Sequence, residues 1–323
     1  MDDVDGVLAD VQHRHHVSPE RLEVIRTVVD KLVVLASIDT NVDDLRVAVS
    51  ALGELVDAST LFAQWRGVPK LAVFGSARTS ADSPLYEMAR GLSAAMAERG
   101  WMTVSGAGPG IMEASAMGAG RTHTLGVNID LPFEQFANQF IDAETMLVAM
   151  QHFFTRKVAM TRPSNAFAIF PGGLGTMDET FEVLTLLHTG KSSPAPVVLM
   201  DAPDGTFWRQ WTHFVEHAIT ADGYIDEQDL CLVRPCATVD EAVTEIERFY
   251  SNYRRFEVVD GRALVGVART PDASQLDEMA IRLPVFARGG PPRLDDEHTI
   301  SFEFDGRNFV NLRLLIDLIN TWR

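Results

Sequence analysis

The sequence predicts an α/β fold built on a doubly wound, Rossmann-like parallel sheet, with a helical N-terminal extension and a small α+β appendage at the C-terminus. Between residues 67 and 252, short apolar runs alternate with amphipathic stretches, which is typical of parallel strands joined by helices. The apolar runs lack two-residue alternation, as expected for strands covered on both faces. Residues 1–66 instead show apolar side chains mainly at helical spacing.

The N-terminal extension contains two helical runs with start signals. Pro19 opens a run that extends to residue 37, and Asn41 stands where it could cap a second run over residues 42–65. Gly67 and Pro69 then break the pattern. We therefore expect a helical extension over residues 1–66, a Rossmann-like domain over residues 67–252 and an appendage over residues 253–323.

The middle part reads as six strands and six helices, with a helix after every strand except the one over residues 124–129. The expected strands are residues 71–76, 102–107, 124–129, 144–150, 166–170 and 196–200. The expected helices are residues 84–99, 110–120, 152–160, 176–188, 207–219 and 239–252. The tail reads strand, strand, helix, strand and helix, interrupted by a loop over residues 287–298.

The composition excludes several classes of protein. The 323 residues contain 28 Lys and Arg against 45 Asp and Glu, a net charge of −17 that would repel a nucleic-acid backbone. No apolar stretch approaches the roughly 18 residues of a membrane span. The N-terminus is acidic where a secretory signal would be basic, and Cys231 and Cys236 read as reduced thiols. We expect a cytoplasmic protein that binds neither nucleic acid nor membrane.

Three glycine-bearing turns follow predicted strands, at the sheet edge where open α/β proteins bind ligands. They are Gly75-Ser76, the run Gly106-Ala107-Gly108-Pro109-Gly110, and Pro171-Gly172-Gly173-Leu174-Gly175-Thr176. Glycine lets the backbone approach a ligand, and a helix that starts directly afterward offers free amides to a phosphate. Each glycine is equally explained by the turn itself. The glycine spacing and the lack of an acidic residue other than Asp130 argue against a dinucleotide site.

The third turn combines a phosphate cradle with a carboxylate. Thr176 and Glu179 share one face of a helical turn, about 4.5 Å apart along its axis. A phosphate on the amides of residues 172–176 would therefore have Glu179 further into the cleft. The alternative is a capping box, in which Thr and Glu only satisfy each other's amides. Arg156 and Lys157 on the preceding helix suggest an anionic partner, although a solvated helix face is the more common explanation.

These segments resemble a known family. The run PGGLGTMDE (171–179) is similar to the P-G-G-x-G-T-x-x-E signature of the LOG ("lonely guy") proteins, and Arg156-Lys157 matches their Arg-Lys pair. Gly75-Ser76 resembles their first strand-turn, and GAGPGIMEAS (106–115) and GVNIDLPFEQ (126–135) resemble segments of the larger bacterial members. The resemblance covers about residues 70–250.

The resemblance implies a phosphoribohydrolase that cleaves a nucleoside 5′-monophosphate, of the AMP or GMP type, to free base and ribose 5-phosphate. It implies a catalytic pair formed by Arg156 and Glu179, no metal or redox cofactor, and a homodimer or larger homo-oligomer. The substrate-binding residues that it implies are Gly75, Ser76, Gly106, Gly108, Glu113, Lys157, Gly172, Gly173, Gly175 and Thr176, with the last four at the 5′-phosphate.

The chain also departs from the small plant-type members. It carries both terminal additions and reads GAGPG where the short forms have three glycines, so the preferred base stays open, cytokinin nucleotides included. Two other functions stay open as well. One is a phosphate-ligand carrier of the same fold, such as a molybdenum-cofactor carrier, and the other is a regulatory protein whose tail binds a nucleotide. No lysine lies in a recognisable pyridoxal-phosphate context, which argues against the decarboxylase label that some members carry.

Overall fold

The computed structural model describes residues 2–39, 41–131, 137–282, 290–304, 306–307 and 309–322. The chain divides into two compact units, Met1–Val56 and Asp57–Arg323. None of the helices in the described ranges is both long and apolar enough for a bilayer crossing. The predicted three-part division, with boundaries after residues 66 and 252, stays a prediction.

The first unit is helical, as the sequence predicts. It contains α1 (Asp2–His15), α2 (Pro19–Ser37) and the larger part of α3 (Val42–Ala63). The Ser18 side chain accepts the amide of Arg21, so it caps α2 with Pro19 directly behind it. The Asn41 side chain accepts the amide of Asp43 at 3.0 Å, which supports the start of α3. Local capping chemistry therefore sets where these helices begin.

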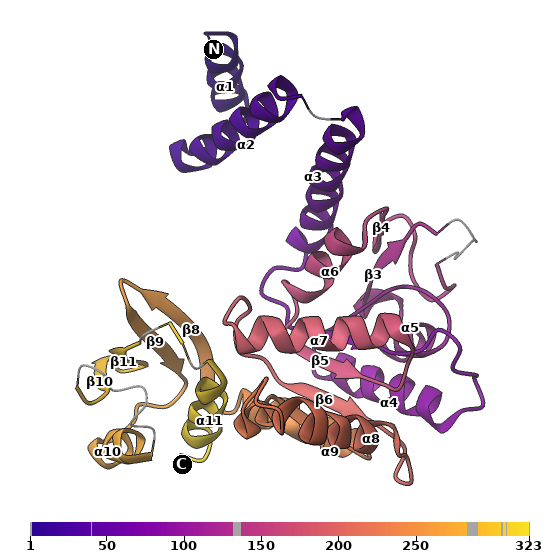
Figure 1. Ribbon diagram of the computed structural model, residues 1–323, viewed down its shortest axis with the longest axis vertical. Coiled ribbons are helices and arrows are strands. Elements are labelled where there is room, and N and C mark those ends of the chain that lie inside the picture. Colours follow the sequence, from indigo (N-terminus) through magenta and orange to yellow (C-terminus); the bar gives the residue numbers. More distant parts are fainter. Residues whose placement is uncertain are drawn as a thin grey trace. The chain divides into compact units, whose positions relative to one another are not determined.

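The second unit is built on a seven-stranded parallel sheet with the order β4-β3-β2-β1-β5-β6-β7 (Figure 1). Its strands are β1 (Lys70–Phe74), β2 (Met102–Ser105), β3 (Thr124–Ile129), β4 (Leu147–Met150), β5 (Ala166–Ile169), β6 (Val197–Met200) and β7 (Val233–Cys236). This confirms the doubly wound sheet that the sequence predicts.

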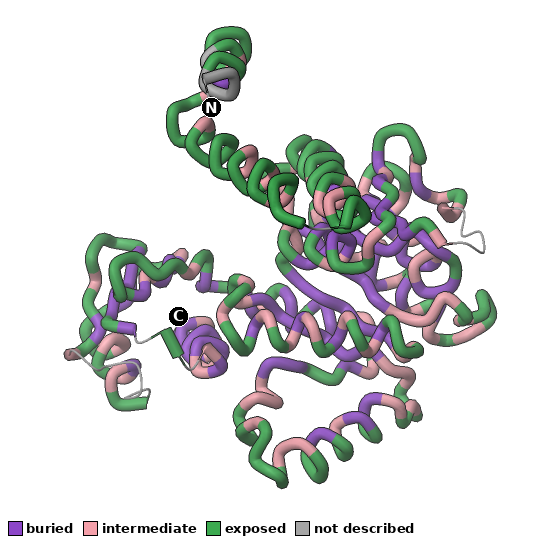
Figure 2. The backbone as a smooth tube through the Cα atoms, turned by 45° about the horizontal axis from the view of Figure 1, so that its top comes forward, coloured by how far each residue is buried: buried purple, intermediate pink, exposed green. Residues whose placement is uncertain are grey.

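Alternate strand residues enter two separate cores. Ala72 and Phe74 of β1 belong to one core, whereas Leu71 and Val73 belong to the other. The connecting helices are α4 (Pro84–Glu98), α5 (Ile111–Ala119), α6 (Phe153–Thr161), α7 (Leu174–His188), α8 (Phe207–Phe214) and α9 (Val239–Phe249). The first core packs against α6, α7 and α8, and the second against α4 and α9. Buried residues therefore gather along the strands (Figure 2).

The chain reverses its winding direction at β1. Strands β2, β3 and β4 extend the sheet to one side of β1, and β5, β6 and β7 extend it to the other. The carboxyl ends of β1 and β5, which are neighbours in the sheet, therefore flank the topological switch point, where open α/β sheets bind ligands. The turns that begin at Gly75 and Pro171 follow these two strands directly.

The C-terminal appendage is a four-stranded antiparallel sheet with two helices. Its strands are β8 (Tyr253–Val259), β9 (Arg262–Val267), β10 (Arg293–Asp296) and β11 (Thr299–Glu303), in the order β10-β11-β9-β8, and its helices are α10 (Ala273–Arg282) and α11 (Phe309–Ile319). Buried Arg313 of α11 pairs with buried Glu245 of α9. The side chain of Asn252, fully buried, donates to the carbonyl of Ile319 at 2.9 Å. Polar contacts therefore fasten the appendage to the Rossmann-like part.

Several elements differ from the prediction. The strands β7 and β10 both lie in segments that were predicted to be connections. The strand β10 falls within the expected loop over residues 287–298. Residues 287–289 of that loop lie outside the described part of the chain. The helix expected over residues 207–219 instead divides into α8 and a π-helix, Val215–Thr220. A short 3₁₀ helix, Glu227–Leu232, then precedes β7.

Candidate functional site

A buried ion pair joins α6 to α7 beside the switch point. Arg156, in the first turn of α6, directs its guanidinium inward and is 10% exposed in its side chain, and Glu179 of α7 is 14% exposed. Arg156 Nη1 donates to Glu179 Oε1 at 3.1 Å, and Arg156 Nε donates to the carbonyl oxygen of Val127, near the end of β3, at 3.0 Å. The two residues that the sequence paired are therefore in direct contact, and the end of β3 holds the arginine in place.

Burial makes the Glu179 carboxyl electrostatically unusual. Removal from water raises the pKa of Glu179, and the nearby charge and hydrogen bond of Arg156 offset only part of that rise. A carboxylate in such a position interacts strongly with any positive charge that develops nearby, because little water screens it. Perturbed carboxyl groups of this kind are typical of functional sites.

Gly106 leaves the space that the Arg156 guanidinium occupies. A Cβ atom at residue 106 would overlap Arg156 Nη2 and would come within 2.8 Å of the Met112 sulfur. The glycine at this turn is therefore required by a side chain that comes from α6, rather than by its own backbone conformation. This contact joins the second glycine turn to the ion pair.

Gly106→Ala is expected to displace Arg156 and to lower the free energy of unfolding by about 1–3 kcal/mol, the usual cost of overpacking. The measurement is urea unfolding, with the Arg156–Glu179 contact checked in a crystal structure of the variant. Gly91→Ala on α4 is the matched control, because its Cβ would lie 3.4 Å from the nearest side-chain atom and alanine favours a helix. Equal stability of the two variants, with Arg156 unmoved, would contradict the packing described here.

The N-terminus of α7 is open to a ligand. Its N-cap is Gly173, without a side-chain cap, and the carbonyl of Gly173 accepts the first helical amide, that of Met177, at 3.0 Å. The amides of the first turn lack intrahelical partners, as in any helix. Leu174 is 92% exposed, and Gly173 and Gly175 are also exposed. This turn therefore presents uncapped amides and the positive end of the helix dipole at its surface.

Thr176 does not form the capping box that was the alternative explanation. Because the N-cap is Gly173, Thr176 is the third residue of α7 rather than its cap. Thr176 is buried, and a Cβ at Gly172 would overlap its hydroxyl. The hydroxyl of Thr176 therefore lies directly against the Gly172 backbone in the same turn.

The three glycine turns contact one another through backbone hydrogen bonds. The amide of Ser76 donates to the carbonyl of Pro171 at 3.2 Å, and the amide of Ile111 donates to the carbonyl of Ser76 at 3.1 Å. Gly110 has a φ of +66°, and a Cβ there would overlap the backbone of Ser76. Gly75 is equally constrained, because its Cβ would meet Ile111 at 2.7 Å. The turns predicted from three separate segments thus form one surface.

Lys157 differs from its neighbour Arg156, because it is bound to acidic residues of α7. Its ammonium lies 3.0 Å from a carboxylate oxygen of Glu182 and 3.2 Å from one of Asp178. Burial alone would lower the pKa of Lys157, but these two carboxylates raise it above its ordinary value. Lys157 of α6 therefore binds two carboxylates of α7, Asp178 and Glu182, which come before and after Glu179 in the sequence.

Two further residues that were predicted for the site are Glu113 and Gly108. Glu113, in the first turn of α5, acts on Tyr86 of α4: burial raises the pKa of Tyr86, and the charge of Glu113 adds to the rise. The carbonyl of Gly108 accepts the side-chain amide of Asn138 at 3.1 Å. Asn138, which the sequence did not single out, also donates to the carbonyl of Ala107 and so stabilises this turn. Residues 132–135 of the segment quoted for the family resemblance lie outside the described residues.

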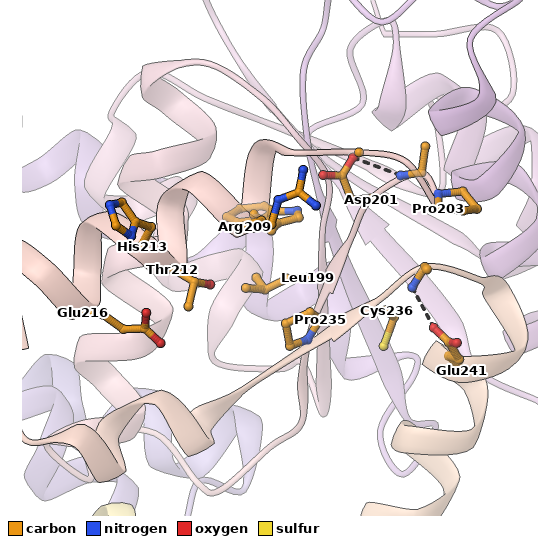
Figure 3. Close-up of a pocket in the computed structure, with 14 residues that line it drawn as sticks. Leu199, Asp201, Pro203, Arg209, Thr212, His213, Glu216, Pro235, Cys236 and Glu241 are labelled. Atoms are coloured by element: carbon orange, nitrogen blue, oxygen red, sulfur yellow. Dashed lines mark hydrogen bonds between the residues drawn. The ribbon is translucent and has the colours of Figure 1, made fainter.

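A separate pocket of about 540 Å³ lies beyond the ends of β6 and β7 (Figure 3). None of the residues predicted for the site lines it. Two of its carboxylates have structural roles, because Asp201 accepts the amides of Ala202 and Phe207, and Glu241 accepts that of Ala237 at 2.7 Å. Within the described ranges, no group of three or more His, Cys, Asp or Glu residues is arranged to hold a metal.

Comparison with known proteins identifies the family. A family model described as "possible lysine decarboxylase" matches residues 96–246. The cytokinin riboside 5′-monophosphate phosphoribohydrolase of Rhodococcoides fascians is 31% identical over 194 residues, which cover 58% of this chain and 95% of that protein. The enzyme of the same name from Mycobacterium tuberculosis is 32% identical over 158 residues, covering 46% and 76% of the two chains.

A solved structure, the molybdenum cofactor binding protein from Rippkaea orientalis, is 19% identical with a TM-score of 0.40, and the match covers 56% of this chain and 97% of that one. The match to the Rhodococcoides protein extends over almost the whole of that relative. The signature PGGLGTMDE and the buried Arg156–Glu179 pair lie within the segment that the family model matches. Because the Rhodococcoides protein is 31% identical and is covered over 95% of its length, the chain belongs to the LOG family of phosphoribohydrolases.

Proposed function

We propose that this protein hydrolyses the N-glycosidic bond of a nucleoside 5′-monophosphate of the AMP or GMP type, releasing the free base and ribose 5-phosphate. The single observation that carries the proposal is the buried Arg156–Glu179 pair next to the uncapped N-terminus of α7. An acid next to a phosphate cradle suits a substrate whose scissile bond lies one sugar away from its phosphate. The family's named members support the same reaction class.

The 5′-phosphate would bind the first-turn amides of α7, over residues Gly172 to Thr176. Exposed glycines at 173 and 175 let the phosphate approach the backbone, and the helix dipole favours its charge. Backbone donors also explain how a chain of net charge −17 would bind an anion. Gly75, Ser76, Gly106 and Gly108 would contribute further backbone to the same site, since their turns are joined by hydrogen bonds to the turn at Pro171.

Glu179 would act at the anomeric carbon. When the glycosidic bond breaks, the ribose ring takes on positive oxocarbenium character, and an ionised carboxylate in a poorly solvated position stabilises that charge. Water then adds to the anomeric carbon, and the base leaves with a proton. Arg156 would hold the Glu179 carboxylate in position and keep it ionised, because the guanidinium partly offsets the effect of burial on its pKa. We propose that Glu113 also contacts the ribose of the substrate. We propose that Lys157 contacts the substrate as well, because it lies beside Glu179.

The phosphate anchor makes a strong prediction about substrates. AMP is expected to be cleaved at least 10²-fold faster than adenosine in kcat/KM, because binding energy from the remote phosphate positions the sugar for reaction. The measurement is release of adenine, the product common to both compounds, from matched concentrations of AMP and adenosine, followed by chromatography. Equal rates for both would show that the α7 amides are not the anchor. Tight binding of AMP without any release of base would favour a carrier function instead.

We also propose a homodimer that forms through α6 and α7. Phe153, Phe154 and Val158 of α6 and Leu174 of α7 are large apolar side chains left exposed near the site, with Phe153 and Phe154 more than half exposed. Exposed apolar side chains that gather in one region are typical of interaction surfaces.

A cytoplasmic location stays a prediction.

Phe154→Asp is expected to convert the dimer to a monomer, because the partner would have to bury an unpaired charge. The measurement is light scattering coupled to size-exclusion chromatography at several protein concentrations. Ile281→Asp on α10 is the matched control, since Ile281 is even more exposed and lies in the appendage. A wild-type protein that is monomeric throughout, or a control variant that dissociates equally, would contradict this interface.

A further inference from the structure

The second glycine turn holds one residue in a strained conformation. Ala107 has a φ of +60°, in the left-handed region that residues with a Cβ atom rarely adopt, and it is fully buried. The absence of a side chain at Gly126 of β3 makes room for the Ala107 Cβ, because a Cβ at Gly126 would lie 3.0 Å from it. Strained residues of this kind persist where the surrounding contacts over-determine them, and they cluster at functional sites. Contacts from outside the turn must therefore hold Ala107 in place.

Asn138 holds this turn from a separate segment. Its side-chain amide donates to the carbonyl oxygens of Ala107 and Gly108, both at 3.1 Å, and its backbone amide donates to that of Ala107 at 2.8 Å. Its side-chain oxygen accepts the backbone amide of Phe140 at 3.2 Å, which fixes the direction of the side-chain amide. Two carbonyls of the turn are therefore tied to one asparagine, which lies 30 residues beyond Gly108.

The position of the same turn determines the space for the Arg156 guanidinium. A Cβ at Gly106 would overlap Arg156 Nη2, so the backbone of residue 106 lies directly against the guanidinium. Arg156 Nε and Nη1 are bonded to Val127 and Glu179. The guanidinium is thus confined by the end of β3, by the carboxylate and by the turn that Asn138 holds. A change of φ at Ala107 would rotate the peptide that joins it to Gly106 and so alter the third of these contacts.

We propose that Asn138 is a positioning residue for the reaction at Glu179. It holds Ala107 in the left-handed conformation and so keeps Gly106 in place against the Arg156 guanidinium. The guanidinium in turn stays on the carboxylate. The effect of Asn138 on hydrolysis rests on the proposed function, whereas its effect on the ion pair does not.

The ionisation of Glu179 reports this series of contacts. Burial raises the pKa of Glu179, and the charge and hydrogen bond of Arg156 lower it. The charge of Asp178 raises this pKa and that of Lys157 lowers it, and these two residues are bonded to each other at 3.2 Å. A neutral substitution at Asn138 that lets Arg156 move away is therefore expected to raise the pKa of Glu179 further. A general loss of stability is not expected to do so.

The test compares Asn138→Ala with the wild-type chain by carbon-13 NMR of the glutamate carboxyl groups, with the Glu179 signal assigned by its loss in Glu179→Gln. The midpoint of the Glu179 titration is expected to move upward by about 1 pH unit, the lower end of the effect of a nearby opposite charge. In steady-state cleavage of AMP, kcat is expected to fall roughly 10- to 10²-fold, as small misplacements of catalytic groups do. KM should stay nearly unchanged, because the phosphate anchor on α7 is intact.

Ala107→Gly supplies a rescue. Glycine adopts a positive φ without the penalty that alanine has, so the turn depends less on Asn138 when residue 107 is glycine. The double variant Asn138→Ala/Ala107→Gly is expected to recover roughly threefold or more in kcat relative to Asn138→Ala. Its Glu179 titration should return toward the wild-type midpoint. Asn138→Ser replaces Asn138→Ala if circular dichroism shows that the latter does not fold, because the serine hydroxyl still accepts the Phe140 amide.

Asn320→Ala is the matched control. The Asn320 side chain also joins backbone groups of a separate segment, because it donates to the carbonyl of Phe249 at 2.7 Å and accepts the amides of Asn252 and Tyr253. It lies directly after α11 in the appendage. The control should lower the midpoint of urea unfolding and leave the Glu179 titration where it is in the wild type.

The proposal is overturned by an unchanged Glu179 titration in Asn138→Ala, by an equal movement in Asn320→Ala, or by a double variant without recovery. A titration that moves while kcat stays constant would remove Asn138 from the reaction. If none of these proteins cleaves AMP, the proposed function fails, and the NMR titration still decides whether Asn138 positions the ion pair.

Discussion

Glu179→Gln is expected to lower kcat for AMP cleavage by roughly 10²–10³-fold while the protein stays folded. Removing one preorganised electrostatic contact to a transition state typically has an effect of this size. The amide has the shape of the carboxyl but carries no negative charge for the oxocarbenium-like sugar. The loss should therefore fall on kcat and leave KM for the phosphate-anchored substrate nearly unchanged. The measurement is steady-state release of adenine.

Asp178→Asn is the matched control for that variant. Asp178 is the neighbouring carboxylate on α7, and Lys157 retains its contact with Glu182 when Asp178 is neutralised. The control should keep most of the activity. A fully active, correctly folded Glu179→Gln protein would remove Glu179 from the mechanism, as would an equal loss of kcat in Asp178→Asn.

The Arg156→Lys variant is expected to be less active than the wild type. The pH below which its kcat/KM falls is expected to be higher than in the wild type. Lysine ends in a single ammonium nitrogen. It therefore cannot replace both the bond from Arg156 Nε to Val127 and the bond from Arg156 Nη1 to Glu179. Loss of that contact removes the partial offset to burial, so the pKa of Glu179 rises further above its ordinary value. Because the proposed mechanism requires the ionised carboxylate, kcat/KM should fall as pH is lowered through this raised pKa, and at a higher pH in the variant than in the wild type.

The same pair sets a pH dependence of stability. Because the folded-state pKa of Glu179 is raised, this group stabilises the fold below its unfolded-state value of about 4.5, and the contribution is lost as pH rises through the folded-state pKa. Arg156→Ala, which leaves a buried carboxylate without a partner, should cost about 3–5 kcal/mol at neutral pH and less in acid. Urea unfolding at several pH values measures this difference. A variant whose stability loss does not shrink in acid would contradict the buried ion pair.

The sheet was predictable where strands are buried on both faces, and less so at the edge. Runs such as residues 71–74 and 166–169 are wholly apolar, and they form the central strands β1 and β5. The edge strand β7 has the sequence Val-Arg-Pro-Cys, and its arginine and proline gave it the appearance of a loop. Proline is tolerated there because an edge strand pairs on one side only. The strand β10 contains two aspartates and was concealed in the same way.

The residues of the candidate site could be named from the sequence, but their contacts could not. Arg156 and Glu179 lie 23 residues apart, and only the family resemblance paired them before the structure brought their side chains together. No local pattern in the sequence shows that Lys157 is held by Glu182, that Asn138 stabilises the second glycine turn, or that Gly106 makes room for a guanidinium. Such contacts arise from packing between separate elements, and sequence spacing reports only on neighbours along one element.

The bond that this protein breaks can be identified directly by incubating AMP with the purified chain in water enriched in heavy oxygen and analysing the products by mass spectrometry. Adenine and ribose 5-phosphate are expected in equal amounts, with one heavy oxygen on the anomeric carbon of the sugar and none in the phosphate. Heavy oxygen in the phosphate, with adenosine as the other product, would contradict cleavage at the glycosidic bond and with it the role assigned to Arg156 and Glu179.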